Sequence, residues 1–325
     1  MKKRLPDLPP RLLPFFAANA RDLPWRKNRS PSAVLVSEIM LQQTRVDTVT
    51  SYFQRFMAEL PTVHALAEVP EDRLLALWEG LGYYRRVRNL QKAAQMIVNE
   101  FGGEFPSSPE DLRKLPGVGA YTAGAIASIA FGLPAPAVDG NVLRVLSRIT
   151  ASAWTADDAA DALKTQYPAG RCGDFTESLM ELGATVCVPN GAPHCENCPV
   201  RDVCRSASGA WRDWPKKPEK KARRVETLTV YLLKHNGRIA CRRRPETGLL
   251  AGLWELPNEP GELSPEHAAK YGKVVSARHG KHIFTHVEWR MTVYTVEAAD
   301  ENAEFVWTSP DGLPLPTAFR KFVQT

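Results

Sequence analysis

Two carboxylic acids stand in this 325-residue chain where acid–base chemistry is possible. The first, Glu38, is the single ionisable residue of the apolar stretch 32–44, SAVLVSEIMLQQT, which we expect to be a helix. If Glu38 faces the core, loss of water raises its pKa toward the value that a general acid needs at neutral pH. If it faces solvent on an amphipathic helix, it has no such role, and the residues alone leave both interpretations open.

The second acid, Asp139, lies in Val138-Asp139-Gly140-Asn141, directly before a helix predicted over residues 142–149. A carboxylate at that position can serve chemistry at the mouth of the helix. Asp-Gly is also an ordinary turn dipeptide, so Asp139 in isolation is better explained as a helix cap. We count Asn141, in the same turn, with Asp139 among the candidate catalytic residues.

A glycine-rich turn precedes this acid. Gly117, Val118 and Gly119 lie in Leu115-Pro116-Gly117-Val118-Gly119, where two glycines permit a tight turn and leave backbone N–H groups pointing outward. The helix predicted from about Ala120 to Ala130 consists of small residues, so a phosphate could approach its N-terminus closely. Glycine needed only for the sterics of a helix–helix turn is the alternative.

Four of the six cysteines form a local group, Cys187, Cys195, Cys198 and Cys204, while Cys172 and Cys241 stand apart. This grouping favours a metal site in a reducing compartment over a set of disulfides. A zinc site and an iron–sulfur cluster both remain open from the spacing, since only one short Cys-x2-Cys pair is present.

The elements that must position these residues change character along the chain. From Pro31 to about Ser206 the apolar spacing is helical, and residues 211–225 are rich in Lys, Arg and Pro, which indicates an exposed basic linker. Beyond it the apolar period becomes two, and Asn236-Gly237 is typical of a hairpin. We therefore predict a helical domain over 1–210 and an α+β domain over 226–325.

Composition restricts the function without selecting it. The net charge of +6 permits a polyanionic partner, and 44% hydrophobic residues are typical of a globular protein. The N-terminal segment lacks the apolar run of a signal peptide and no stretch is long enough to span a bilayer, so we expect a cytoplasmic protein with no membrane partner.

Five blocks together resemble the MutY family of adenine DNA glycosylases, in the family's order and over nearly the whole chain. They are LPWR (23–26), SEIMLQQT (37–44), GLGYYRRVRNLQKAA (80–94), LPGVGAYTAGAI (115–126) and VDGNVLRV (138–145). The resemblance implies a multidomain fold: an all-α helix-hairpin-helix glycosylase domain with an iron–sulfur loop, then a Nudix-like (MutT-like) α+β domain. It also implies base-excision repair, with removal of adenine mispaired with 8-oxoguanine or guanine in double-stranded DNA, by a monomer associated with the bacterial nucleoid.

The resemblance further implies roles for the two acids. Glu38 would protonate adenine at N7 and later activate water, while Asp139 would stabilise the oxocarbenium-like sugar, two roles that glycosidic cleavage requires. In the related endonuclease III family a lysine attacks the sugar at the position of Tyr121, and a phenol cannot form that imine. We therefore expect a monofunctional glycosylase. An endonuclease III-like pyrimidine glycosylase and a catalytically silent DNA-binding scaffold are the alternatives.

Residues that hold the substrate follow from the resemblance as well. The helical domain would contribute Trp25, Arg26, Gln42, Gln43, Tyr83 and Glu177, with Tyr83 wedged beside the lesion and Glu177 hydrogen-bonded to adenine. The C-terminal domain would sense 8-oxoguanine through Phe284, Thr285 and His286, where the family has Phe-Ser-His. It lacks the Arg-Glu-x-x-Glu-Glu run of Nudix hydrolases, so we expect no nucleotide hydrolysis from it.

The cysteine group then corresponds to a [4Fe-4S] loop, with Cys187, Cys195, Cys198 and Cys204 as ligands. Seven residues separate Cys187 from Cys195 where the family has six, so the loop must bulge by one residue. Its expected role is structural, carrying Arg201 and Arg205 toward phosphate. We considered a metal site at His279, His282 and His286 and disfavour it, because no other ligand accompanies them.

Overall fold

The computed structural model describes residues 4–216 and 222–323 and divides into two compact units. The first comprises residues 1–70 and 85–218, and the second residues 71–84 and 219–325. The predicted domain limits follow this division except for segment 71–84, and they stay a prediction. Residues 217–221 of the predicted linker lie outside the described residues.

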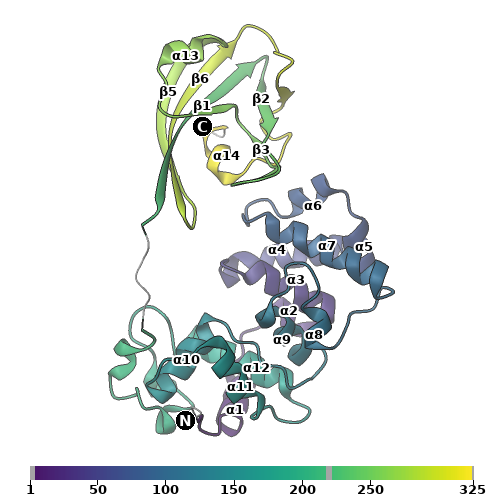
Figure 1. The fold of residues 1–325 in the computed structure, drawn as a ribbon, viewed down its shortest axis with the longest axis vertical. Helices are drawn as coiled ribbons and strands as arrows, with labels where there is room; N and C mark the ends of the chain where they lie inside the picture. The colour runs from purple at the N-terminus through teal and green to yellow at the C-terminus, as the bar shows by residue number, and fades with distance from the viewer. Residues whose placement is uncertain (1–3, 217–221, 324–325) are drawn as a thin grey trace. The chain divides into compact units, whose positions relative to one another are not determined.

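The first unit is helical throughout its described part, as predicted (Figure 1). Its helices are α1 (Pro9–Asn19), α2 (Pro24–Lys27), α3 (Pro31–Leu41), α4 (Val46–Glu59), α5 (Val63–Glu68), α7 (Arg85–Glu100), α8 (Pro109–Leu112), α9 (Ala120–Ile129), α10 (Gly140–Thr150), α11 (Ala156–Lys164) and α12 (Cys172–Glu181), then the π-helix η1 (Leu182–Val186) and the 3-10 helices η2 (Cys195–Asn197), η3 (Arg201–Val203) and η4 (Ala210–Asp213).

Helix α3 has a clear start and an earlier end than we predicted. The Ser30 hydroxyl accepts a hydrogen bond from the Ala33 N–H at 3.3 Å, and Pro31 occupies the first turn, where its missing N–H has no cost. The predicted helix 32–44 is too long at its C-terminal end, because α3 stops at Leu41. Gln43 has φ +58°, a left-handed conformation that takes the chain out of the helix.

Close packing around helix α9 explains why its residues are small. A Cβ atom on Gly124 would lie 2.1 Å from the carbonyl oxygen of Pro136, so only glycine allows the returning chain to pass so closely. Ala123, Ala125 and Ala127 on this helix are fully buried. The small residues therefore allow close packing within the chain. We had ascribed them only to the approach of a phosphate.

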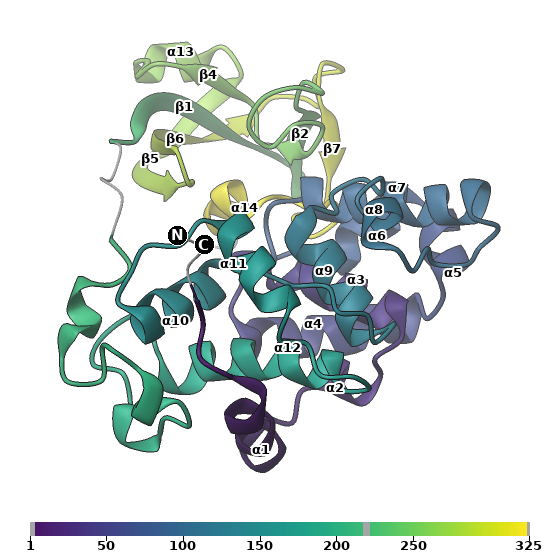
Figure 2. The ribbon, with the colours of Figure 1, turned by 60° about the horizontal axis from the view of Figure 1, so that its bottom comes forward.

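Helix α9 lies between α3 and α12 in the packing of this unit, and α10 packs against α12 (Figure 2). Helix α12 packs against α1 and α9, and α9 packs against α3. One buried apolar cluster joins α10, α12 and the N-terminal segment through Val145, Leu146, Phe175 and Leu12. This packing brings segments more than 100 residues apart in sequence to one place.

The second unit contains a seven-stranded sheet in the order β3-β2-β1-β6-β5, with β4 beside β1 and β7 beside β2. Its elements are α6 (Glu71–Leu77), β1 (Arg224–His235), β2 (Arg238–Arg243), β3 (Trp254–Glu255), β4 (Asn258–Pro260), α13 (Pro265–Ala269), β5 (Gly272–Ile283), β6 (Val287–Ala298), β7 (Val306–Thr308) and α14 (Thr317–Val323). Strands β1 and β6 run parallel, with Leu228 opposite Met291, and the other pairs are antiparallel.

Alternation along β1 and β6 buries both faces of this sheet. Val230 and Trp289 face α14, where Phe319 is fully buried, whereas Tyr231 and Tyr294 belong to a separate cluster that includes Ala268 of α13. The predicted hairpin at Asn236-Gly237 is confirmed, since both residues have positive φ and His235 pairs with Arg238. Among the described residues, no helix has the length and apolar character needed to cross a bilayer.

Candidate active site

A cavity of about 620 Å³ opens in the first unit between α3, α9, α10 and α12. It gathers most of the predicted catalytic and base-contacting residues, and these come from widely separated blocks of the sequence. The predicted residues that line it are Trp25, Arg26, Glu38, Gln42, Gln43, Tyr121, Asp139, Asn141 and Glu177. Tyr83, the 117–119 turn, the four cysteines and residues 284–286 lie elsewhere.

Glu38 is buried in this cavity, with a residue exposure of 6%. The solvent-facing interpretation is therefore wrong. The pKa of Glu38 is raised to about 7, chiefly by burial; a hydrogen bond with Tyr121 lowers it, and the charges of Asp139 and Glu177 add to the rise. A carboxyl group with this pKa is protonated in a large fraction of molecules at neutral pH, as a general acid requires.

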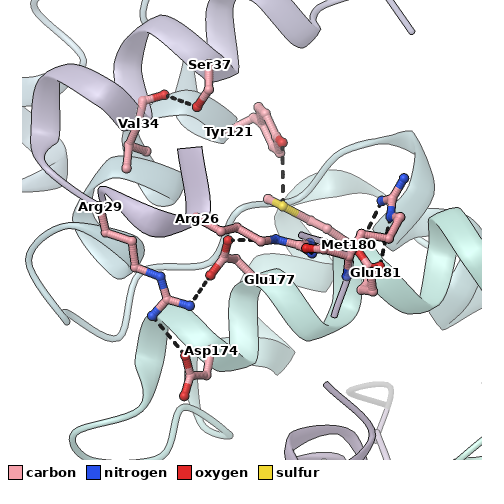
Figure 3. A network of polar contacts seen from close by, with 10 residues as sticks. Arg26, Arg29, Val34, Ser37, Tyr121, Asp174, Glu177, Met180 and Glu181 are labelled. Atoms are coloured by element: carbon pink, nitrogen blue, oxygen red, sulfur yellow. Dashed lines mark hydrogen bonds and ion pairs between the residues drawn. The ribbon is translucent and has the colours of Figure 1, made fainter. Parts of the chain in front are cut away.

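Tyr121 stands on the first turn of α9 beside Glu38. Its hydroxyl lies 4.0 Å from the Met180 sulfur (Figure 3), and burial, followed by the charge of Glu38, raises its pKa well above the ordinary value. Tyr121 therefore stays a neutral phenol that can donate a hydrogen bond.

Asp139 caps α10 and also faces the cavity. One carboxylate oxygen accepts from the Val142 N–H at 2.7 Å, and the other accepts from the Asn141 amide at 2.7 Å. Asn141 is held in turn, because Arg144 donates to its side-chain oxygen at 3.0 Å. The helix-cap interpretation is thus correct for one oxygen, while Asn141 fixes the direction of the other. Arg144 was not among our predicted residues.

Arg86 of α7 supports the end of α3, which sequence reasoning missed. Its guanidinium donates to the carbonyl oxygens of Ile39 at 2.9 Å, Met40 at 3.1 Å and Gln42 at 2.5 Å. These are carbonyls that a helix end leaves unpaired. This arginine fixes the turn that carries Gln42 and Gln43 into the cavity.

Ion pairs surround Glu177 of α12 (Figure 3). Arg26 donates to Glu177 at 3.2 Å and to Glu181 at 2.7 Å, and Arg29 contacts both Glu177 and Asp174. Burial raises the pKa of Glu177, whereas the ion pairs with the two arginines act against that rise. Arg29 and Glu181 carry no local motif in the sequence, and we did not predict either.

The 115–119 turn has the geometry that its glycines suggested. Gly117 has φ +81°, and Gly119 is the N-cap of α9 with no side chain over the helix N-terminus. A Cβ on Gly117 would lie 2.9 Å from the Asn89 Cβ, so this glycine is required sterically as well. The N-terminus of α9 is open to an anion, but a phosphate site there stays a prediction.

All four clustered cysteines line one small apolar pocket beside η1. Arg148 donates to the Cys187 sulfur at 3.4 Å, and burial raises the pKa of Cys198 to about 11, with the other three thiols adding to the rise. The longer first interval closes through a hydrogen bond from His194 N–H to the Val186 carbonyl at 2.9 Å. Within the described residues, no three His, Cys, Asp or Glu side chains are arranged to hold a single metal ion.

The predicted lesion-contacting residues lie in the second unit. Tyr83 is 50% exposed with φ +46°, whereas its neighbour Tyr84 is buried as a core aromatic. The Tyr83 hydroxyl is 2.9 Å from the hydroxyl of Thr285, in the turn between β5 and β6. Thr285 and His286 are exposed, while the Phe284 ring packs edge-on against Trp289 at 4.9 Å. Phe284 is therefore part of the core, and the other two remain accessible.

Comparison with known proteins places this geometry in a family. The profile of the HhH-GPD superfamily of base excision DNA repair proteins matches residues 36–168, and that of the NUDIX domain matches residues 228–325. Among solved structures, the chain is similar to a thermostable thymine-DNA glycosylase (TM-score 0.56, 28% identity, 61% of this chain and 94% of that one) and to endonuclease III in a non-covalent DNA complex (TM-score 0.54, 28% identity, 62% and 94%).

Curated relatives carry the name adenine DNA glycosylase. The chain is 42% identical to the one from Arabidopsis thaliana, over 76% of this chain and 46% of that protein. It is 36% identical to the one from Homo sapiens, over 93% and 68%, and 35% identical to the one from Rattus norvegicus, over 88% and 69%. The predicted fold class, a helix-hairpin-helix domain followed by a Nudix-like domain, is confirmed. The chain belongs to the adenine DNA glycosylase family.

Proposed function

We propose that this protein removes adenine paired with 8-oxoguanine, or with guanine, from double-stranded DNA and leaves an abasic site. The observation that carries the proposal is that Glu38 and Asp139 line one cavity, with Glu38 buried and its pKa raised to about 7. Cleavage of a glycosidic bond needs an acid for the leaving base and a negative charge for the sugar. The cavity supplies both.

In the proposed reaction, Glu38 gives its proton to N7 of adenine as the bond between N9 and the sugar breaks. The bonding electrons leave with the base, and the Asp139 carboxylate stabilises the oxocarbenium-like sugar. Water then adds to the sugar carbon, and ionised Glu38 takes its proton. The products are neutral adenine and the abasic site, and Glu38 is protonated again.

Strand cleavage by this protein is not part of the proposal. A lyase needs an amine to form a Schiff base with the sugar, and the position expected for it holds Tyr121. Because burial and the charge of Glu38 raise the pKa of Tyr121, its hydroxyl is not an anionic nucleophile either. The lack of an amine here separates the proposal from the endonuclease III-like alternative.

We infer that the duplex is held by three features outside the cavity. The open N-terminus of α9 after Gly119 would bind a backbone phosphate, and the exposed Arg201 and Arg205 would contact others. Exposed Tyr83 and Thr285 of the second unit would contact the lesion. Adenine would leave the stack for the cavity of the first unit, which Gln43 helps to line. We expect the protein to act as a monomer.

We also propose that Cys187, Cys195, Cys198 and Cys204 hold a [4Fe-4S] cluster. They fit such a group, because four thiols share one apolar pocket and four thiolates are the ligands that this cluster takes. Such a cluster is an electron-transfer centre or a structural crosslink, and here its place beside η1 and η3 supports the second role. Arg148, beside the Cys187 sulfur, would offset negative charge on the thiolates.

The test is a single-turnover assay on labelled duplexes carrying adenine opposite 8-oxoguanine, guanine or thymine, each read with and without alkali. Cleavage only after alkali, and only for the first two duplexes, is the expected result. Breaks without alkali would contradict the monofunctional assignment. Excision of a pyrimidine in place of adenine would favour the endonuclease III-like alternative, and binding without any product would favour a silent scaffold.

A further inference from the structure

A chain of ion pairs of alternating charge joins α12 to the segment around α2, next to the cavity, and Figure 3 shows its part from Asp174 to Glu181. Its acidic residues lie three and four positions apart on α12, so they share one face of the helix. Most of its arginines come from the segment around α2. In order, the members are Arg171, Asp174, Arg29, Glu177, Arg26, Glu181 and Arg21. The ion pairs therefore form a connected network rather than a set of separate pairs.

Glu177 is the member of this network whose carboxylate also lines the cavity. Its side chain is 6% exposed, and Arg26 donates to one oxygen at 3.2 Å while Arg29 donates to the other. A carboxylate offers about four acceptor positions. With two of them used by arginines, Glu177 still has lone pairs to offer to a base in the cavity.

Arg29 is oriented by a second acid. Its guanidinium reaches Glu177 through one terminal nitrogen and Asp174 through the other, at 2.9 Å. A planar guanidinium anchored at two points has a fixed direction, which a single ion pair would not give it. Arg29 is not among the residues that line the cavity, whereas Glu177, to which it donates, is one of them.

The charge of Arg29 matters because Glu177 is buried. Burial raises the pKa of Glu177, and among the opposing influences the charge of Arg29 is the largest, ahead of Arg26. The negative charges of Asp174 and Glu38 act in the opposite direction to the arginines, because they raise the pKa of Glu177. Removing the positive charge of Arg29 would raise the pKa of Glu177 further, toward the neutral acid. A neutral carboxyl group can donate a hydrogen bond, whereas a carboxylate can only accept one.

We propose that Arg29 is a positioning residue that makes the cavity select a 6-aminopurine over a 6-oxopurine, by holding Glu177 as a fixed hydrogen-bond acceptor. The inference rests on the proposed function, because it takes a flipped purine as the ligand. An ionised Glu177 accepts from the exocyclic amine of adenine and repels the carbonyl oxygen of hypoxanthine. A neutral Glu177 free to rotate serves both bases.

The experiment compares single-turnover excision of adenine and of hypoxanthine, each opposite 8-oxoguanine, by the full-length protein and three variants. For Arg29→Gln we expect the adenine rate to fall roughly 10- to 100-fold, as for loss of a hydrogen bond to a charged group. Hypoxanthine excision should fall much less, so the adenine-to-hypoxanthine ratio drops at least about tenfold. Arg29→Lys keeps the charge and should restore most of the ratio.

Arg171→Gln is the matched control, since it removes an arginine from the same network that contacts Asp174 but not Glu177. Its ratio should stay within about twofold of the unmodified protein, as for a surface ion pair. If Arg29→Gln does not fold, Arg29→Met takes its place, because it also removes the positive charge beside Glu177, and it should lower the ratio in the same direction.

Two results would overturn the inference. One is an unchanged ratio in Arg29→Gln, or in Arg29→Met where that variant replaces it, whatever happens to the absolute rates. The other is an equal drop in Arg171→Gln. Either is distinct from failure of the proposed function, in which the unmodified protein itself excises no adenine.

Discussion

Replacing Glu38 with Gln should stabilise the protein at alkaline pH, because burying this carboxyl group has a free-energy cost only when it is ionised. The pKa of Glu38 rises from an ordinary 4.5 to about 7 in the folded protein. A difference of about 2.5 units, at about 1.4 kcal/mol per unit, corresponds to about 3 kcal/mol. Glu38→Gln removes that cost while it keeps the size of the side chain.

The sign depends on pH in a defined way. Below pH 4.5 the group is protonated in both the folded and the unfolded chain, so it makes no difference to the free energy of unfolding. As pH rises from 4.5 to 7, the unfolded chain ionises first and the folded protein loses stability. Above pH 7 the full cost of about 3 kcal/mol is present, whereas at pH 5 it is still below about 1 kcal/mol.

The assay is calorimetric melting of the unmodified protein and Glu38→Gln at pH 8.5 and pH 5. We expect a melting temperature about 6–12 °C higher for the variant at pH 8.5, in the transition of the helical unit, and a small difference at pH 5. Glu68→Gln, the same change at an exposed position, should alter neither value. An equal shift at both pH values, or a loss of stability at pH 8.5, would refute the assignment of Glu38 as a buried acid.

Two further variants test the surroundings of this acid. Tyr121→Phe removes the hydrogen bond that lowers the pKa of Glu38. The alkaline limb of the single-turnover pH–rate profile should therefore move to higher pH by about one unit. A limb that stays in place or moves to lower pH would show that the phenol does not act on Glu38. Gly124→Ala places a Cβ 2.1 Å from the Pro136 carbonyl oxygen and should lower the free energy of unfolding by about 1–3 kcal/mol. Gly119→Ala, with no atom within 4 Å of the added carbon, is the stability control, and equal effects from the two would argue against this packing.

Features set by local sequence could be predicted. Asn236-Gly237 specifies its own turn, and the alternation through Val230 and Trp289 follows from a sheet with buried faces. Glu38 is the single ionisable residue of an apolar stretch, and its burial agrees with the core-facing one of the two interpretations that the sequence left open. The resemblance then named most of the residues that line the cavity.

Features that depend on distant segments could not be predicted. Arg29 meets Glu177 from 148 positions away, and Arg86 supports the end of α3 from 42 to 47 positions away, so neither contact leaves a pattern in neighbouring residues. The end of α3 at Leu41 was missed for the same reason, because carbonyls from Ile39 to Gln42 are satisfied by Arg86 rather than by a local cap.

The role of Glu38 as general acid can be tested in one variant that separates the chemical step from DNA binding. For Glu38→Gln we would measure single-turnover excision of adenine opposite 8-oxoguanine and, on the same duplex, the dissociation constant. We expect excision to be abolished while the dissociation constant stays close to that of the unmodified protein, because Glu38 donates a proton and other residues hold the DNA. Excision that survives, or binding that is lost together with it, would contradict the role of Glu38 as the general acid.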